Sequence, residues 1–461
     1  MTGTQLRRSR QQFGLSQAKL AELTGIPQHL LSAFELEKTD LPPALLIEIA
    51  EALSNVDKVA SVAKRVKRYR ESEYVTVKKL PERISKAHQT SGNAIYTDLL
   101  KDLARSHSSA QRHQFSAISL FSGCGGFSLG FSAAGFKIKG FLELEEDLRE
   151  IYKLNFPDSE ELGGDITTVT EESLRTFAAR LGPVDAIIGG PPCQGFSLSG
   201  KREVTDPRNQ LFKHYLRFVD AFQPKVAILE NVRLLTSMKN SKGGFVRDEI
   251  CSEFRGHNYK VKNFEINAKH YGVPQHRERV LFVAVRNDLA FDPSIPAHTH
   301  RDEALNYSLF ASFPSLRTFG DACSDLPYIE SGEKSDVPHH EAVKHPAHVI
   351  DWLWDVPQGF SAHDNRDEAK RPPSGYNTTY KRQVWNEPAS TVQTTFGMIS
   401  GCRNVHPIAT RSLTVREAAR IQSFPDEYQF RGSLGAIRTG IGNAVPPLLG
   451  YHLARHFQEL I

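Results

Sequence analysis

The feature that most constrains the fold of this chain is an apolar run that leads directly into a glycine-rich turn. The run AISLF covers residues 117–121, and SGCGG follows at 122–126. A buried strand that ends in glycines and continues as a helix opens a nucleotide-binding α/β unit. Gly123, Gly125 and Gly126 remove side chains where the backbone would approach a ligand. The turn has neither the dinucleotide spacing G-x-G-x-x-G nor the Lys-Ser/Thr of a phosphate-binding loop.

Further apolar runs alternate with helical stretches downstream of this turn. They are GFLEL (140–144), DAIIGG (185–190), VAILE (226–230) and VLFVAV (280–285). This alternation predicts an α/β fold with a Rossmann-like, doubly wound sheet. Ligands of such sheets bind outside the carboxyl ends of the strands, so we expect the functional residues there.

Two acidic residues follow the glycine turn at positions that suit an adenosine. Glu143 comes twenty residues after Gly123, at the end of the next predicted strand. A carboxylate there can accept hydrogen bonds from both ribose hydroxyls. Asp165, in the phrase GGDI, is placed to meet the adenine amino group. Each signal is weak alone, but together, without a phosphate cradle, they favour S-adenosylmethionine as the cofactor.

The phrase GGPPCQGFS at 189–197 contains the best candidate nucleophile. Pro191 and Pro192 keep the chain out of a helix just before Cys193. A lone cysteine is usually a buried small hydrophobe, but this one follows a strand in a Gly/Pro-rich loop. The five cysteines include no C-x-x-C pair, so we expect no disulfide framework, no metal site and a reducing compartment.

Such a thiol suits methylation of cytosine at C5, a poor carbon nucleophile. Addition of a thiolate to C6 turns C5 into a carbon that can attack the methyl of a sulfonium. The ring also needs an acid near N3, and Glu230, at the end of VAILE, fits this role. Arg277 and Arg279 lie on one face of an extended QHRER segment and suit the cytosine O2 and the target phosphate. A structural salt bridge for the glutamate and surface charges for the arginines are the alternatives.

The ordered set FSGCGG, PPCQ, ENV, QHRER and GNAVPP resembles the cytosine-C5 DNA methyltransferase family from Ala117 to the C-terminus. The resemblance implies that Cys193 is the nucleophile, that Glu230 activates the ring and that Arg279 contacts the cytosine with Arg277 nearby. It implies a mobile catalytic loop, closing over a flipped base, that includes Gln194, Ser197 and Ser199. The positions expected around the cofactor, besides the glycine turn, are Phe121, Glu143, Leu144, Asp165, Ile166, Leu211 and Asn443. Gly440 stands where the family commonly has glutamine.

The same resemblance divides the body of the chain. It predicts a catalytic domain at 117–287 and 406–461, interrupted by a target-recognition region at 288–405. Residues 1–55, with the phrase GLSQAKLAELTGIPQHLLSAFE, resemble a repressor-type helix-turn-helix domain. Ser16 is the expected N-cap of its first helix, Thr24-Gly25 the turn, and the second helix, from about Pro27 to Glu37, would enter the major groove.

Residues 56–116 are predicted to be a basic helical linker. Residues 1–116 together hold 18 Lys/Arg against 12 Asp/Glu, which favours a polyanionic partner. A solvated basic face, or a small helical bundle used for dimerisation, are the alternatives for this part of the chain.

We therefore expect a cytoplasmic DNA methyltransferase that acts on double-stranded DNA without any membrane association. The resemblance suggests a role in restriction–modification, beside an endonuclease that acts on the same site. We expect a monomer as the enzyme and a dimer when the N-terminal domain regulates transcription at an operator. Two alternatives remain open, a tRNA cytosine-C5 methyltransferase and a repressor with a vestigial enzyme body. Methylation of an amino group fits less well, because PPCQ stands where those enzymes have D/N/S-P-P-Y/F.

Overall fold

The computed structural model describes residues 1–66, 82–109, 114–192, 210–240, 243–301 and 314–461. The chain divides into two units, Met1–His88 with Pro327–Glu330, and Gln89–Leu326 with Ser331–Ile461. Cys193 and the predicted loop residues Gln194, Ser197 and Ser199 lie outside the described residues. In the described ranges, no helix is both long and apolar enough to cross a membrane.

The first unit is helical and has its own core. Its helices are α1 (Gly3–Gln12), α2 (Gln17–Thr24), α3 (Gln28–Glu35) and α4 (Pro43–Val66). The predicted Ser16 cap is confirmed, since its side chain accepts a hydrogen bond from Lys19 N, and Gly25 ends α2 with φ of 69°. The two short helices of the sequence pattern are therefore α2 and α3. The apolar residues that meet in the core are Leu6, Leu20, Ile26, Leu31, Phe34, Leu41, Ile49 and Leu53.

The second unit is built on a seven-stranded sheet, which confirms the predicted fold class. The strand order is β3-β2-β1-β4-β5-β7-β6. All pairs are parallel except those of β7, which runs antiparallel to both β5 and β6. The strands are β1 (Phe115–Leu120), β2 (Phe136–Leu142), β3 (Glu160–Glu161), β4 (Ala186–Gly189), β5 (Val226–Val232), β6 (Tyr259–Asn267) and β7 (Glu278–Arg286).

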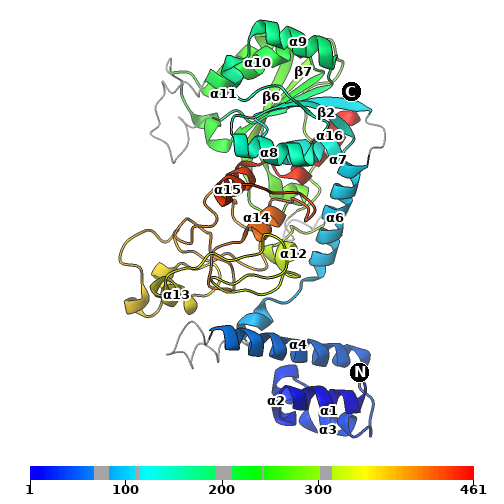
Figure 1. The fold of residues 1–461 in the computed structure, drawn as a ribbon, viewed down its shortest axis with the longest axis vertical. Helices are drawn as coiled ribbons and strands as arrows, with labels where there is room; N and C mark the ends of the chain where they lie inside the picture. The colour runs from blue at the N-terminus through cyan, green and yellow to red at the C-terminus, as the bar shows by residue number, and fades with distance from the viewer. Residues whose placement is uncertain (67–81, 110–113, 193–209, 241–242, 302–313) are drawn as a thin grey trace. The chain divides into compact units, whose positions relative to one another are not determined.

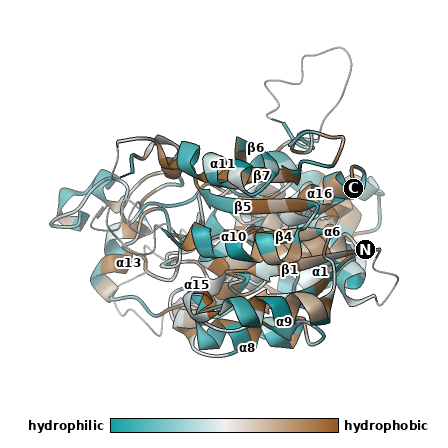
Figure 2. Cartoon of the chain, turned by 90° about the horizontal axis from the view of Figure 1, so that it is seen from above, coloured by the Kyte–Doolittle hydropathy of each residue, from teal (hydrophilic) through white to brown (hydrophobic). Residues whose placement is uncertain are grey.

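Helices cover both faces of this sheet (Figure 1). One face carries α7 (Gly126–Ala133), α8 (Glu146–Asn155) and α16 (Pro447–Gln458). The other carries α9 (Glu171–Leu181), α10 (Leu211–Phe222) and α11 (Val246–Gly256). Figure 2 shows the central strands β4 and β5 as largely apolar, as expected for strands buried on both faces, and the polar residues of β5, Glu230 and Asn231, come near its end.

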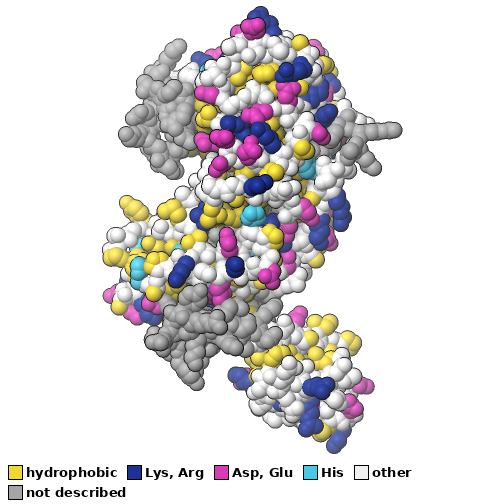
Figure 3. Space-filling model, viewed as in Figure 1, with side chains coloured by type: hydrophobic (Ala, Val, Ile, Leu, Met, Phe, Trp, Pro, Cys, Tyr) yellow, Lys and Arg dark blue, Asp and Glu magenta, His cyan; other side chains and the backbone are white. Residues whose placement is uncertain are grey.

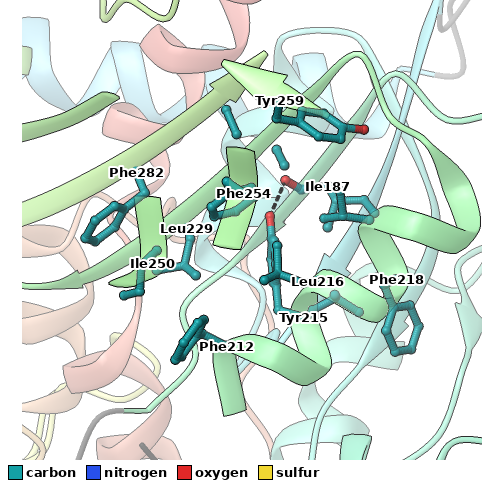
Figure 4. Close-up of a cluster of buried hydrophobic side chains, with 14 of the residues drawn as sticks. Ile187, Phe212, Tyr215, Leu216, Phe218, Leu229, Ile250, Phe254, Tyr259 and Phe282 are labelled. Carbon is teal, nitrogen blue, oxygen red and sulfur yellow. Dashed lines mark hydrogen bonds between the residues drawn. The ribbon is translucent and has the colours of Figure 1, made fainter. Parts of the chain in front are cut away.

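The core on the α9–α11 face is closed by aromatic side chains that keep their polar atoms bonded (Figure 4). The Tyr215 hydroxyl donates to the carbonyl oxygen of Ile187 at 2.8 Å. The hydroxyl of Tyr259 donates to Pro224 O at 2.7 Å. Buried hydroxyls without such partners would cost free energy, so these bonds let aromatic residues fill the space beneath the strand ends.

Helix α6 (Ser91–Ser108), within the predicted linker, is packed against the second unit. It runs from α12 (Phe319–Cys323) to α7 (Figure 1). Tyr96 is fully buried, and its hydroxyl donates to Arg420 O at 2.6 Å. At the other end, His107 Nδ1 lies 2.8 Å from Ser132 Oγ on α7. This helix is therefore an integral part of the second unit.

The described part of the predicted target-recognition region has little regular structure. The buried Arg382 donates to Leu353 O within this region, at 2.9 Å. It also ties the region to the residues that follow it, because it donates to the carbonyl oxygens of His406, Ile408 and Ala409. The remaining elements of the unit are η1 (Ile166–Thr168), η4 (Arg233–Ser237), η5 (Ala268–Tyr271), α13 (Ala347–Trp354), η7 (Ala362–Asp364), η8 (Glu368–Lys370), α14 (Val415–Ile421) and α15 (Leu434–Asn443).

Candidate active site

The glycine turn after β1 combines one open position with two close packing contacts. Gly123 has φ of 55°, and a Cβ atom there would meet nothing within 4 Å. A Cβ on Gly125, with φ of 92°, would lie 2.5 Å from the Tyr428 hydroxyl. At Gly126 it would lie 2.5 Å from Val445 O. Gly123 therefore leaves space for a ligand, whereas the other two glycines allow close packing.

Glu143 follows β2 and faces this turn. Its side chain is buried, at 7% exposed, and Oε2 accepts a hydrogen bond from Gly123 N at 2.7 Å. Oε1 accepts from Glu145 N at 3.0 Å. Burial raises the pKa of the Glu143 carboxyl, and the two backbone N–H groups oppose this rise. Each oxygen keeps a second lone pair, so the carboxylate can still accept ribose hydroxyls.

The residues beside Glu143 include an exposed apolar side chain and an arginine that fixes the backbone. Leu144 is 60% exposed, which leaves an apolar side chain available to cover a ring. Arg149 fixes this segment, because Nη1 donates to Glu143 O and Leu144 O while Nε pairs with Glu161 on β3. On the face drawn in Figure 3, acidic and basic side chains are intermixed over α8, as this pairing requires.

The other predicted cofactor positions lie around the same strand ends. Asp165 is exposed and accepts hydrogen bonds from Thr167 N and Oγ1, while Ile166 is buried. Phe121 and Leu211 both pack against the sheet core, and Asn443 is exposed at the end of α15. Helix α15 reaches the glycine turn, because a Cβ on Gly440 would lie 2.9 Å from Cys124 Cβ.

The same contact gives a packing reason for the departure at Gly440. Besides Cys124, a Cβ there would lie 3.0 Å from Leu148 Cδ2 on α8. A glutamine at this position would need both neighbours to move. Glycine therefore allows α15 to pack closely on α8 and on the glycine turn.

Glu230 lies near the end of β5 and is 8% exposed. Arg279 Nε lies 2.8 Å from its Oε1, and among the described residues Oε1 makes no hydrogen bond. Gly190, at the end of β4, is so close that a Cβ there would lie 3.2 Å from Glu230 Oε2. Asn231 Nδ2 donates to Pro191 O at 2.9 Å. The chain that leads to Cys193 is therefore fixed directly beside a buried carboxyl group.

The two arginines of the QHRER segment lie in different surroundings. Arg279 pairs with Glu230, as described above. Arg277 is 1% exposed, and both of its Nη atoms donate to Gly442 O at 3.2 Å. Burial lowers the pKa of Arg277, as does the nearby charge of Arg279, whereas Glu230 raises it.

Several side chains that support this site gain their partners only in the folded structure. The Tyr428 hydroxyl donates to Cys124 O in the glycine turn. Gln275 Nε2 donates to Gln422 Oε1 at 2.8 Å, and Gln422 Nε2 donates to Ile441 O at 2.5 Å. These partners are far apart in the chain, so only the folded structure brings them together.

Comparison with known proteins agrees with this geometry. A sequence profile of C-5 cytosine-specific DNA methylases matches residues 115–459, and a helix-turn-helix profile matches residues 6–57. The chain is 38% identical over 341 residues to Type II methyltransferase M1.HphI of Haemophilus parahaemolyticus, covering 73% of this chain and 85% of that protein. It is 35% identical over 378 residues to Type II methyltransferase M.DdeI of Desulfomicrobium norvegicum, covering 73% and 87%.

Among solved structures, a protein described as a DNA modification methyltransferase encoded within an E. coli prophage is similar. It superimposes with a TM-score of 0.57 at 26% identity, over 75% of this chain and 99% of that one. The chain belongs to the C-5 cytosine-specific DNA methylase family. It is accordingly a DNA (cytosine-5-)-methyltransferase, with a helix-turn-helix domain at its N-terminus.

Proposed function

We propose that this enzyme transfers the methyl group of S-adenosylmethionine to C5 of a cytosine flipped out of a specific DNA site, through a transient bond between Cys193 Sγ and C6. The observation that supports it most is the buried Glu230, which lies beside Arg279 and next to the segment leading to Cys193. Flipping is required because C6 cannot be reached inside a stacked duplex, and it costs a few kcal/mol.

In the proposed reaction, the Cys193 thiolate adds to C6 while Glu230, as a carboxylic acid, donates a proton towards N3. S-adenosylmethionine, when bound, supplies an electrophilic methyl group. C5 would take up this methyl group as its bond to sulfur breaks, and S-adenosylhomocysteine would leave. A base would then remove the C5 proton, N3 would return its proton to the Glu230 carboxylate, and the Cys193 thiolate would leave C6 to restore the C5–C6 double bond. Arg279 orients the Glu230 carboxyl and addresses the cytosine O2.

The strand ends β1, β2 and β3 supply the proposed cofactor site. Glu143 accepts the ribose hydroxyls, Leu144 covers one face of the adenine, and Asp165 meets its amino group. The space at Gly123 admits the cofactor next to the backbone. Phe121, Gly125, Gly126, Ile166, Leu211 and Asn443 shape the remaining boundary.

Transfer of a labelled methyl group to unmethylated genomic DNA and to tRNA tests this function. We expect label on DNA with the wild type and none with Cys193→Ser. Cys251→Ala is the matched control, because Cys251 lies on α11, outside both the proposed site and the predicted target-recognition region, and this variant should retain activity. Label on tRNA alone would favour the RNA-modifying alternative, and no label at all would favour a vestigial enzyme body.

We further propose that the methylation protects DNA within a restriction–modification system, as the Type II names of the relatives suggest. A cognate endonuclease would cut the same sequence and need not touch this protein. Once the methylated cytosines are mapped, DNA from cells that express the enzyme should resist an endonuclease of that specificity. Cleavage at fully methylated sites would contradict this role.

A second function, transcriptional regulation by the first unit, is supported by the surface of α3. Gln28 and His29 at its N-terminal end are exposed, whereas Leu31 and Phe34 are buried in the core. This arrangement presents polar side chains to a major groove, with two copies on paired half-sites of an operator. The full chain should bind DNA upstream of its own gene, and Gln28→Ala should weaken that binding without reducing methyl transfer. Equal affinity for a scrambled duplex would contradict it.

A further inference from the structure

A series of buried polar side chains lies between the Arg279–Glu230 pair and the end of α15 at Asn443. We propose that Gln275, Arg277 and Gln422 are positioning residues, which fix the Gly442–Asn443 segment relative to the Arg279–Glu230 pair. This inference rests on the proposed function, because it takes Asn443 to border the cofactor.

The hydrogen bonds run continuously through four separate segments of the chain. Val392 N donates to Gln275 Oε1 at 2.9 Å, and Gln275 Nε2 donates to Gln422 Oε1 at 2.8 Å. Gln422 Nε2 then donates to Ile441 O at 2.5 Å. Both glutamine side chains are fully buried. An amide in the interior is costly unless its donors and acceptors are bonded, so each partner fixes the next.

Arg277 joins the two ends of this series of hydrogen bonds. Its Nη atoms donate to Gly442 O, and Nη1 also reaches Val392 O at 3.4 Å. Its hydrogen bonds in the described structure go to carbonyl oxygens, and its Nε makes none. A buried cation without a bonded carboxylate is expensive. Stability alone would be better served by an apolar side chain, which favours a role in holding the geometry.

The position of Arg277 in the sequence indicates which parts of the site this network fixes. It lies two residues before Arg279, which pairs with Glu230. Its acceptor Gly442 immediately precedes Asn443. Gly442 is also packed so closely on Thr394 that a Cβ there would overlap the Thr394 backbone nitrogen. The network thus ties the segment that leads into β7, α15 and the segment around Val392 to one another.

The expected consequence is a loss of both turnover and affinity for S-adenosylmethionine. If the Gly442–Asn443 segment shifts by about 1 Å, misalignment of methyl donor and base can lower kcat about a hundredfold. The affinity for S-adenosylmethionine should fall about tenfold in the same variant. DNA affinity measured without cofactor should change much less, because the partners of the network in the described residues, Val392 of the predicted target-recognition region included, are buried.

The test compares Arg277→Met, Arg277→Lys and Tyr259→Phe in the full chain. Tyr259→Phe is the control, because it also removes one buried hydrogen bond to a carbonyl oxygen, that of Pro224. Tyr259 begins β6, whereas Arg277 lies beside the opposite end of that strand. Calorimetric titration with S-adenosylmethionine gives both affinity and stoichiometry, and steady-state kinetics separates kcat from KM. We expect Arg277→Met to weaken binding at full stoichiometry, Arg277→Lys to restore part of it, and Tyr259→Phe to bind like the wild type.

A purely structural role would give the opposite pattern. Arg277→Met would then reduce the fraction of binding-competent protein, while the surviving molecules kept wild-type affinity and KM, and this would overturn the inference. If the wild type itself failed to bind S-adenosylmethionine, the proposed function would fail and this inference with it.

If Arg277→Met does not fold, the two glutamines provide a second test. Gln275→Leu and Gln422→Leu each leave a buried partner without its hydrogen bond. We expect each single variant to weaken cofactor binding about fivefold and the double variant to be no weaker than the singles, since coupled partners are not additive. Strictly multiplicative effects would refute the network.

Discussion

Helix α6 provides the sharpest stability prediction, because it lies in a stretch whose sequence indicates only a basic connector. Leu100 is 3% exposed on its packed face, whereas Ile95 on the same helix is 65% exposed. Truncating a buried leucine to alanine costs about 2–5 kcal/mol, and alanine itself favours the helix. We therefore expect Leu100→Ala to lower the free energy of unfolding of the second unit by about 3 kcal/mol. Ile95→Ala should change it by less than about 0.5 kcal/mol.

Tryptophan fluorescence measures this unit selectively. The chain has three tryptophans, Trp352, Trp354 and Trp385, and all of them lie in the second unit. A loss of about 3 kcal/mol moves the midpoint of urea unfolding down by about 1 M or slightly less, because the slope of a unit this large is about 3 kcal/mol per M or more. Equal midpoints for Leu100→Ala and Ile95→Ala would refute the reasoning and would make α6 a tether with no share in the fold.

Three further predictions concern other parts of the molecule. His345 Nε2 accepts a hydrogen bond from Ser412 N at 3.1 Å, and burial, with nearby Arg411 and Arg438, lowers the pKa of His345 to about 4. In the unfolded chain the His345 imidazole takes up a proton at a pKa of about 6.5, so the free energy of unfolding should be full above pH 6.5 and fall towards pH 4. His345→Gln should remove up to about 3 kcal/mol of this pH-dependent loss, measured by urea unfolding across that range. Glu143→Gln keeps the shape but replaces one acceptor with a donor that faces a backbone N–H, so calorimetry should show about tenfold weaker binding of S-adenosylmethionine. Unchanged affinity would exclude Glu143 from the cofactor site. Arg10 makes two hydrogen bonds to the buried Glu35 carboxylate, so Arg10→Met should destabilise the first unit by about 2–3 kcal/mol and abolish operator binding, while methyl transfer to DNA continues.

The strand ends could be predicted from the sequence because each depends on a few consecutive residues, an apolar run and the polar residues directly after it. The apolar runs predicted the parallel strands β1, β2, β4 and β5, and the polar residues at their ends, Glu143 above all, lie where parallel strands deliver them. The run VLFVAV predicted β7, which is antiparallel to its neighbours. The run GFLEL was placed slightly late, since β2 ends at Leu142 and leaves Glu143 beyond the strand. That displacement is what lets the carboxyl group turn back to Gly123.

Strand β6 was not predicted, because it does not form a continuous apolar run. In YKVKNFEIN, lysines at 260 and 262 alternate with buried residues, as is typical of an edge strand with one solvated side. The role of α6 could not be read from its sequence either, since the acceptor of its buried Tyr96 hydroxyl, Arg420 O, lies 324 residues away in the chain. The same holds for the Gln275–Gln422 pair, whose amides are informative only once folding has buried them.

The most direct test of the central claim is the chemical identity of the methylated base. DNA modified by the wild type, by Glu230→Gln and by Cys193→Ser would be digested to nucleosides and measured by mass spectrometry. We predict 5-methyldeoxycytidine as the methylated nucleoside made by the wild type, and none above background with either variant. Methyl groups on the amino nitrogen of cytosine or adenine, or undiminished 5-methyldeoxycytidine with Cys193→Ser, would contradict it.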